Sequence, residues 1–217
     1  MPPTLDAELA AAEAEPITSI AQLEAIVGEV RQTSIDKESV AMTPLEQEFV
    51  RASPFYLLAT ASADGMCDVS PRGGPPGSVL VACDRTLILP EWPGNRRIDS
   101  LRNIVENPRV GLLFLVPGCD ETLRINGSAR ITTHATLLER LAVEGKRPQL
   151  AIVVHTGQVY MHCARAFRRS RVWDASTWPE PGTVPQMPSV LKEKLCLAEP
   201  LEEIAAEREE RYRGSLY

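Results

Sequence analysis

The sequence has few of the residues that build metal sites and disulfide frameworks. It contains three histidines and five cysteines in 217 residues. The cysteines are scattered and odd in number, and no two of them form a C-x-x-C pair. These absences argue against a zinc site and against a disulfide framework, so we expect no metal and reduced thiols.

Long hydrophobic runs and common nucleotide-binding motifs are also missing. The longest apolar runs, such as residues 110–117, are far too short to cross a bilayer. The amino-terminal stretch is acidic and lacks the basic start of a signal peptide. Neither a G-x-G-x-x-G fingerprint nor a P-loop occurs. We therefore expect a cytoplasmic protein with no membrane contact.

The charges are unevenly distributed around a net charge of −6. Residues 1–50 hold ten acidic and two basic side chains, and residues 199–217 hold six and three. The middle of the chain has 13 acidic and 18 basic side chains. The acidic ends would repel a polyanion at long range, so no nucleic-acid partner is expected. A basic centre favours a small anionic ligand held by a few arginines.

The hydrophobic pattern predicts helices at both ends and strands between them. Helical spacing over 17–30 and 43–52 follows cap residues at Thr18/Ser19 and at Thr43, with Glu46 completing the second cap. Seven strand-like segments follow, separated by turn signals and by a helix near 98–107. They cover residues 55–62, 66–70, 78–82, 86–90, 110–116, 121–133 and 150–163, the last with a kink at Gly157.

Hairpins with few helical crossovers favour a closed or nearly closed antiparallel β-barrel, a mainly β fold with added helices. We expect no regular element in the proline- and glycine-rich segment 71–77, a helix over 135–145 and an extended proline-rich segment over 177–189. The predicted division is a helical extension over 1–48, a barrel domain over 49–175, and a proline-rich segment with a carboxy-terminal helix over 176–217. That last helix is expected to pack on the barrel or on a partner subunit.

Two polar stretches are candidates for an anion site. Ser70 and Arg72 lie at the end of a predicted strand, in or beside a glycine-rich loop. Asn95, Arg96, Arg97 and Ser100 lie at or near the start of a predicted helix, where unpaired N–H groups and the helix dipole favour an anion. The alternative is that both stretches are solvated surface. Arg102, one turn later, competes with Arg96 and Arg97 for the ligand-facing position.

A third candidate is the stretch "HCARAFRRSRVWD", in which Trp173 could stack on a planar ring. The alternative is a core tryptophan beside a solvated basic turn. His162 and Cys163 do not form a nucleophilic pair, because adjacent strand residues point to opposite faces. No residue is identified as a catalytic acid or base.

Four segments together resemble the pyridoxamine 5′-phosphate oxidase class of FMN-binding split-barrel proteins, most of all its branch of FMN-dependent enzymes. They are "FYLLATASADGMCDVSPRGGPPG", "TLILPEWPGNRRIDSLRNIVENPRVGLLFLVPG", "ETLRINGSARIT" and "VYMHCARAFRRSRVWD". The resemblance runs from about Phe49 to Asp174.

This resemblance implies a six-stranded antiparallel split barrel and a homodimer with FMN at the subunit interface. It assigns the FMN phosphate to Ser70, Arg72, Asn95, Arg96, Arg97 and Ser100, and it places Trp173 beside the flavin. The chain departs from the oxidase pattern, since the loop after the second strand has no lysine. The Ser-Arg-Lys run of the oxidase is replaced here by Asn-Arg-Arg at residues 95–97. An ungapped alignment counted back from Asn107-Pro108 would place that run on residues 98–100 instead.

These observations favour an FMN-dependent oxidoreductase acting on a small molecule that the sequence does not identify. The alternative is a non-catalytic module that carries or senses a flavin or another cofactor. A haem-binding split barrel using His155 or His162 is a third and weaker possibility.

The sequence makes one site prediction directly. Replacing Arg97 with alanine should weaken FMN binding while the protein stays folded, because each lost charge-assisted contact costs about 1.5–3 kcal/mol. Flavin titration of Arg97→Ala measures this loss, and an unchanged affinity would move the phosphate site elsewhere.

Overall fold

The structure is a computed structural model that describes residues 4–217. The chain divides into two compact units, one ending at Lys37 and the other spanning Glu38–Tyr217. The predicted domain boundaries after residues 48 and 175 remain predictions.

The amino-terminal unit contains three short helices: α1 (Leu5–Ala14), α2 (Ile20–Val27) and α3 (Gln32–Asp36). The predicted cap of α2 is confirmed. The Gln22 N–H donates to the Ser19 hydroxyl at 3.2 Å, and the Ser19 N–H donates to the Gln22 side chain at 3.1 Å. None of the described residues of this unit is buried, so no core of its own stabilises these helices.

The second unit begins with α4 (Pro44–Ala52) and continues into a sheet. The predicted cap by Thr43 and Glu46 is confirmed as a reciprocal capping box. The strands are β1 (Phe55–Ala61), β2 (Cys67–Gly73), β3 (Leu80–Cys83), β4 (Thr86–Glu91), β5 (Arg109–Leu115), β6 (Thr122–Thr132) and β7 (Leu150–His162). Two helices are inserted between strands: α5 (Asp99–Glu106) and α6 (Ala135–Arg140).

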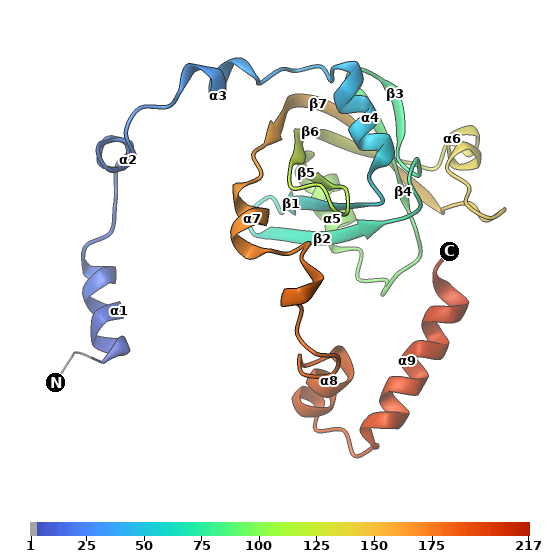
Figure 1. The fold of residues 1–217 in the computed structure, drawn as a ribbon. Helices are drawn as coiled ribbons and strands as arrows, with labels where there is room; N and C mark the ends of the chain where they lie inside the picture. The colour runs from blue at the N-terminus through green and yellow to red at the C-terminus, as the bar shows by residue number, and fades with distance from the viewer. Residues whose placement is uncertain (1–3) are drawn as a thin grey trace. The chain divides into compact units, whose positions relative to one another are not determined.

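All described strands belong to one antiparallel sheet in the order β2-β1-β5-β6-β7-β4-β3 (Figure 1). The expected number of six strands is wrong, because the structure has seven. The short β3 forms a hairpin with β4 and makes one edge of the sheet, and β2 makes the other. The sheet is therefore open at these two edges, an arrangement consistent with the split-barrel class.

A β-bulge interrupts the pairing of the two longest strands, β6 and β7. The register passes from Asn126 opposite Gln158 to Gly127 opposite Thr156, which leaves Gly157 as the extra residue. The predicted kink at Gly157 is thus confirmed.

One buried cluster fills the concave side of the sheet. It includes side chains from β1, β4, β5, β6 and β7 together with Val50 of α4 and Leu101 and Ile104 of α5. The rings of Tyr56 and Phe114, on the neighbouring strands β1 and β5, have centroids 5.1 Å apart. Because strands from both halves of the sheet contribute to one cluster, the sheet curves around a common core.

Strand β2 extends further than expected. The segment from residue 71 was expected to be irregular, but Pro71, Arg72 and Gly73 pair with β1 as the last residues of β2. Proline is tolerated here because β2 is an edge strand, so the missing N–H can face away from β1. The extension puts Ser70 and Arg72 on one face of a regular strand.

The remaining helices lie after β7: α7 (Arg165–Ser170), a short 3₁₀ helix (Ala175–Thr177), α8 (Met187–Leu195) and α9 (Leu201–Ser215). Helix α8 begins within the segment expected to be extended. A proline in its first turn needs no N–H donor there, so it does not oppose the helix.

Helix α6 ends earlier than predicted. It stops at Arg140 instead of continuing to residue 145. Glu144 and Gly145 adopt positive φ angles of 51° and 76°, and Val143 forms a bridge with Lys146, so the chain turns back. Among the described helices, none has the length and apolar character needed to cross a membrane.

The bulge yields a stability prediction. A Cβ atom at Gly127 would lie 2.1 Å from the His155 carbonyl oxygen, a distance that the backbone cannot accommodate without moving. Gly127→Ala should lower the free energy of unfolding by about 1–3 kcal/mol in a urea titration. Gly214→Ala, which meets open space, serves as the control. Equal stability of the two variants would contradict the close approach.

Candidate functional site

A pocket of about 480 Å³ lies where β2, the end of β4 and the start of α5 meet. Its polar lining comes from alternate positions of β2 and from the loop between β4 and α5. The polar and charged lining residues are Tyr56, Asp68, Ser70, Arg72, Ser78, Glu91, Trp92, Asn95, Arg97, Asp99 and Ser100. Five of the seven residues predicted to bind the cofactor therefore lie around one cavity.

The pocket lies between strands that are not neighbours. Strands β1, β5, β6 and β7 separate β2 from β4 in the sheet. The curvature of the sheet nevertheless brings Arg72 of β2 to Glu91 at the end of β4, where the two side chains form an ion pair. Both are mostly buried, with 18% and 17% of their side-chain surfaces exposed.

A chain of hydrogen bonds runs along this wall of the pocket. The Ser100 hydroxyl donates to Asp68 at 3.2 Å, and the hydroxyls of Ser100 and Ser70 are 3.1 Å apart. The Arg72 Nε donates to the Ser70 hydroxyl at 3.2 Å, and its Nη1 donates to Glu91. The single Ser70 hydroxyl proton has two acceptors within reach, the Ser100 hydroxyl at 3.1 Å and the Leu58 carbonyl oxygen at 3.5 Å. This series of hydrogen bonds fixes the Arg72 guanidinium at the pocket wall.

The loop before α5 has a distinctive backbone. Arg96 and Ile98 have positive φ angles of 61° and 55°, a region that is rarely occupied by a β-branched residue such as isoleucine. The Asn95 side chain accepts a hydrogen bond from the Arg97 N–H at 3.0 Å, and Arg97 Nε donates to Asp99 at 2.8 Å. Arg97 lines the pocket, whereas Arg96 is absent from the lining.

The first turn of α5 supplies further donors. Its N-cap residue is Ile98, which has no side chain that could accept a hydrogen bond from the first backbone N–H groups. Ser100 and Leu101 of this turn line the pocket, and Ser100 is buried. Uncapped N–H groups and the positive end of the helix dipole make this position favourable for an anion.

Burial shifts the titration of two groups beside Arg72. The pKa of Glu91 is raised above its ordinary value because burial disfavours the carboxylate, although the Arg72 charge and its hydrogen bond oppose that effect. Burial also raises the pKa of Tyr56 well above its ordinary value, so the phenol stays protonated throughout the physiological range.

Residues 42–163 match the family model described as pyridoxamine 5′-phosphate oxidase. The chain belongs to the pyridoxamine 5′-phosphate oxidase family. This match covers more than half of the chain, and it confirms the family membership predicted from the four quoted segments.

Solved structures similar to this family member share little sequence with it. HupZ from Group A Streptococcus is 22% identical, with 54% of this chain and 92% of that chain covered and a TM-score of 0.44. An FMN-binding protein from Syntrophomonas wolfei is 13% identical, with 65% and 97% covered and a TM-score of 0.43. General stress protein 26 from Bacillus anthracis is 18% identical, with 52% and 87% covered and a TM-score of 0.38. No curated protein matches the chain.

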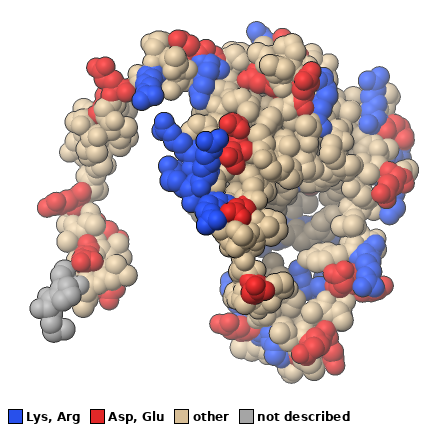
Figure 2. All heavy atoms as spheres, in the orientation of Figure 1, with Lys and Arg blue, Asp and Glu red and all other residues tan. Residues whose placement is uncertain are grey.

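Trp173 lies outside the pocket of this family member. Its Nε1 donates to the Cys119 carbonyl at 2.8 Å, and its ring stacks on Phe167 with centroids 5.6 Å apart. Lys and Arg side chains gather at α7, the helix that precedes Trp173 in the chain (Figure 2). The structure therefore places Trp173 in a cluster of its own, and its predicted contact with the flavin remains a prediction.

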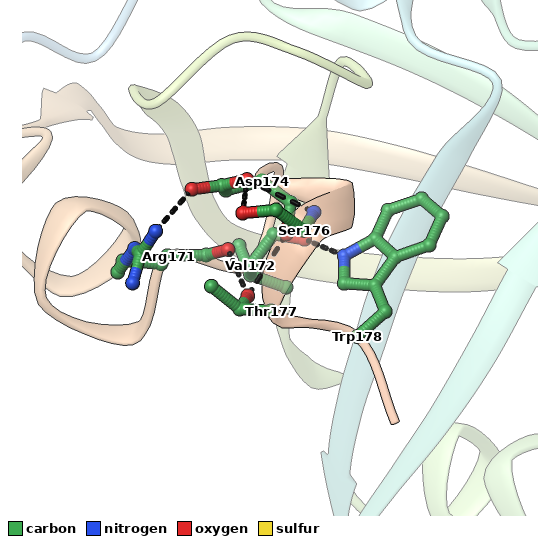
Figure 3. A network of polar contacts seen from close by, with 6 residues as sticks. All are labelled: Arg171, Val172, Asp174, Ser176, Thr177 and Trp178. Carbon is green, nitrogen blue, oxygen red and sulfur yellow. Dashed lines mark hydrogen bonds and ion pairs between the residues drawn. The ribbon is translucent and has the colours of Figure 1, made fainter. Parts of the chain in front are cut away.

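The chain after Trp173 is held by a local network (Figure 3). Arg171 Nη2 donates to Asp174 at 2.6 Å, and the Ser176 hydroxyl donates to the other Asp174 oxygen at 2.6 Å. The Trp178 Nε1 donates to the Val172 carbonyl at 3.0 Å. Arg171 is thus engaged within its own turn.

The histidines do not enter the pocket. His155 Nδ1 lies 3.2 Å from the Thr86 hydroxyl, and the ring centroids of His162 and Tyr160 are 5.0 Å apart. Within the described part of the chain, no group of three or more His, Cys, Asp or Glu side chains is arranged to hold a metal ion.

The sequence reasoning missed several pocket residues, among them Tyr56, Asp68 and Glu91. Asp68 could have been found, because it shares the alternation of Ser70 and Arg72 along β2. No sequence pattern pointed to Glu91, since its contact with Arg72 forms only because two strands far apart in the sheet meet.

The Arg72–Glu91 pair predicts a pH-dependent stability defect. Arg72→Met leaves the Glu91 carboxylate in a mostly buried position without its cation, which should cost about 1–3 kcal/mol of unfolding free energy near neutral pH. Without the cation the folded-state pKa of Glu91 lies further above its unfolded value. Stability should therefore fall as the pH rises through that window, and the defect should shrink in acid.

Urea unfolding of the ligand-free protein over a range of pH measures this defect. Arg72→Met combined with Glu91→Gln is the control, because it removes the uncompensated charge and should restore stability at the higher pH. A stability defect of the same size at every pH would argue that it does not come from the uncompensated Glu91 carboxylate.

Proposed function

We propose that the protein binds FMN in this pocket and acts as an FMN-dependent oxidoreductase on a small molecule. The observation that carries the proposal is the meeting of Ser70, Arg72, Arg97 and Ser100 with the first turn of α5 around one cavity. Guanidinium groups, hydroxyls and helix N–H groups are the donors that bind phosphate in proteins. Family membership supports the same cofactor.

The pocket residues fit the phosphate end of such a ligand. The cavity of about 480 Å³ falls within the range of small-molecule sites. Arg72 is already oriented by Ser70 and Glu91, so little side-chain freedom is lost when an anion reaches it. Arg97 is held by the exposed Asp99, and an anion can compete with that weak surface pair.

When bound, FMN would supply the electron and hydride transfer, while the protein binds and orients the reactants. Ser70, Arg72, Arg97, Ser100 and the α5 N-terminus would hold the phosphate. Asn95 would keep the loop in shape through its bond to the Arg97 N–H. Among the residues predicted to hold the phosphate, Arg96 is the one that does not line the cavity.

We also propose that the curved sheet is a split barrel and that it works as a homodimer in the cytoplasm. The outer faces of the neighbouring strands β1 and β5 carry Phe55, Leu57 and Leu113, which are exposed or half-buried in the single chain. Apolar side chains gathered in this way favour a second protein surface.

The second candidate is a non-catalytic flavin carrier or sensor. It is favoured by the lack of an assigned catalytic acid or base. The two functions differ in turnover with reduced nicotinamide, oxygen or a reduced deazaflavin donor. Sustained turnover of the flavin-loaded protein with one of these partners would support the oxidoreductase and exclude the passive carrier.

The cofactor proposal has a direct test. The purified protein should show the two visible absorbance bands of a flavin or take up added FMN, and riboflavin should bind more weakly because it lacks the phosphate. Arg96→Ala is the matched control for Arg97→Ala: it should keep FMN affinity within about twofold, whereas Arg97→Ala should lose about tenfold or more. Absence of FMN uptake at any pH would overturn the proposal.

A further inference from the structure

Arg72 is only partly used in the structure. A guanidinium has five N–H donors, and those of Arg72 reach the Ser70 hydroxyl and the Glu91 carboxylate. No other residue in the described part of the chain accepts a hydrogen bond from it. Donors therefore remain for a ligand anion while Glu91 is still in place.

The pocket has more acids than bases. Three carboxylates line it, those of Asp68, Glu91 and Asp99, against the two guanidiniums of Arg72 and Arg97. A doubly charged phosphate adds to this excess of negative charge. Unless a proton enters with the ligand, the negative charges of the phosphate and of Glu91 would face each other across the mostly buried Arg72.

Glu91 is the carboxylate best placed to take up that proton. Asp99 is 46% exposed and pairs with Arg97 at the surface, so water screens it. Asp68 already accepts a hydrogen bond from the Ser100 hydroxyl and, within the described part of the chain, makes no ion pair with Arg72. Glu91 is paired with Arg72, the residue that an incoming anion would also contact, and it is itself mostly buried.

The other elements near Glu91 contribute Tyr56 of β1, Leu150 of β7 and the ring of Tyr217, which packs on the neighbouring Trp92 with centroids 4.9 Å apart. Tyr56 of β1 is already protonated, and the residue opposite Glu91 on β7 is Leu150, which does not titrate. Burial has already moved the pKa of Glu91 upward in the ligand-free protein. A second anion on the same guanidinium moves it further in that direction.

We propose that Glu91 is a specificity-determining residue: it is the internal counter-ion of Arg72 and takes up a proton from solvent when a phosphate dianion binds beside it. Glu91 thereby sets the charge that the pocket accepts. The inference rests on the proposed function, because it assumes that the phosphate of FMN binds at Arg72.

The proposal fixes the sign of a pH effect. Between the pKa of Glu91 in the free protein and its higher value in the complex, binding takes up a proton. Affinity should therefore fall by up to about tenfold per pH unit as the pH rises through that window. The phosphate group of the ligand titrates near pH 6, which weakens binding on the acid side in every variant.

The test compares the full-length protein with Glu91→Gln, which keeps the shape of the side chain and cannot change charge. FMN affinity is measured by quenching of flavin fluorescence from about pH 5.5 to about pH 9. Calorimetry in two buffers of different ionisation enthalpy counts the protons taken up. Glu106→Gln, an exposed change at the end of α5, is the matched control.

We expect Glu91→Gln to bind FMN about tenfold or more tightly than the unaltered protein at the highest pH and to take up fewer protons. Glu106→Gln should follow the unaltered protein, and riboflavin should show no difference between the variants. If FMN binds to both the unaltered protein and Glu91→Gln and their affinities change with pH in parallel, the proposed role of Glu91 is overturned but the proposed function is not. Failure of FMN to bind any variant would overturn the proposed function as well.

Discussion

The contact between Arg72 and Glu91 is the interaction on which the site depends. It joins β2, one edge of the sheet, to the end of β4 near the other edge, across four intervening strands. Backbone pairing does not connect these strands in the described structure, so side chains make the connection. The buried cluster beneath them curves the sheet enough for the two residues to meet. Without that curvature Ser70 and Arg72 would not face the start of α5.

This arrangement explains why the site is polar although it borders a hydrophobic core. The polar side chains from Asp68 through the two serines to Arg72 and Glu91 all have partners, whereas the buried Trp92 Nε1 in the pocket lining has none among the described residues. Satisfied networks of this kind are rigid, because any rotation leaves a group without its hydrogen bond. The wall can therefore present a guanidinium in a fixed orientation, while the loop before α5 supplies the more exposed Arg97.

Much of the fold could be predicted from the sequence because its signals are local. The Thr43 and Glu46 cap, the strand segments and the kink at Gly157 each follow from neighbouring residues. The extent of β2 could not be predicted, since a proline is acceptable there only at a sheet edge. For the candidate site, most of the residues predicted in two short stretches line one pocket, and their contact with a cofactor stays a prediction. Glu91 could not be predicted, because it depends on contacts between distant strands. Trp173 was predicted both from its own stretch and from the resemblance, and although its Nε1 donates to the Cys119 carbonyl, its contact with a flavin stays a prediction.

The open sheet has a consequence for how a ligand could enter. Within the described residues β2 and β4 share no backbone pairing, so a small separation of the two edges would break no strand-to-strand hydrogen bond. The pairing of β6 with β7, the two longest strands, would be unaffected by such a separation. A ligand that enters between the two edges would then have to displace only side-chain contacts, chiefly the Arg72–Glu91 ion pair and the hydroxyl contacts of Ser70 and Ser100.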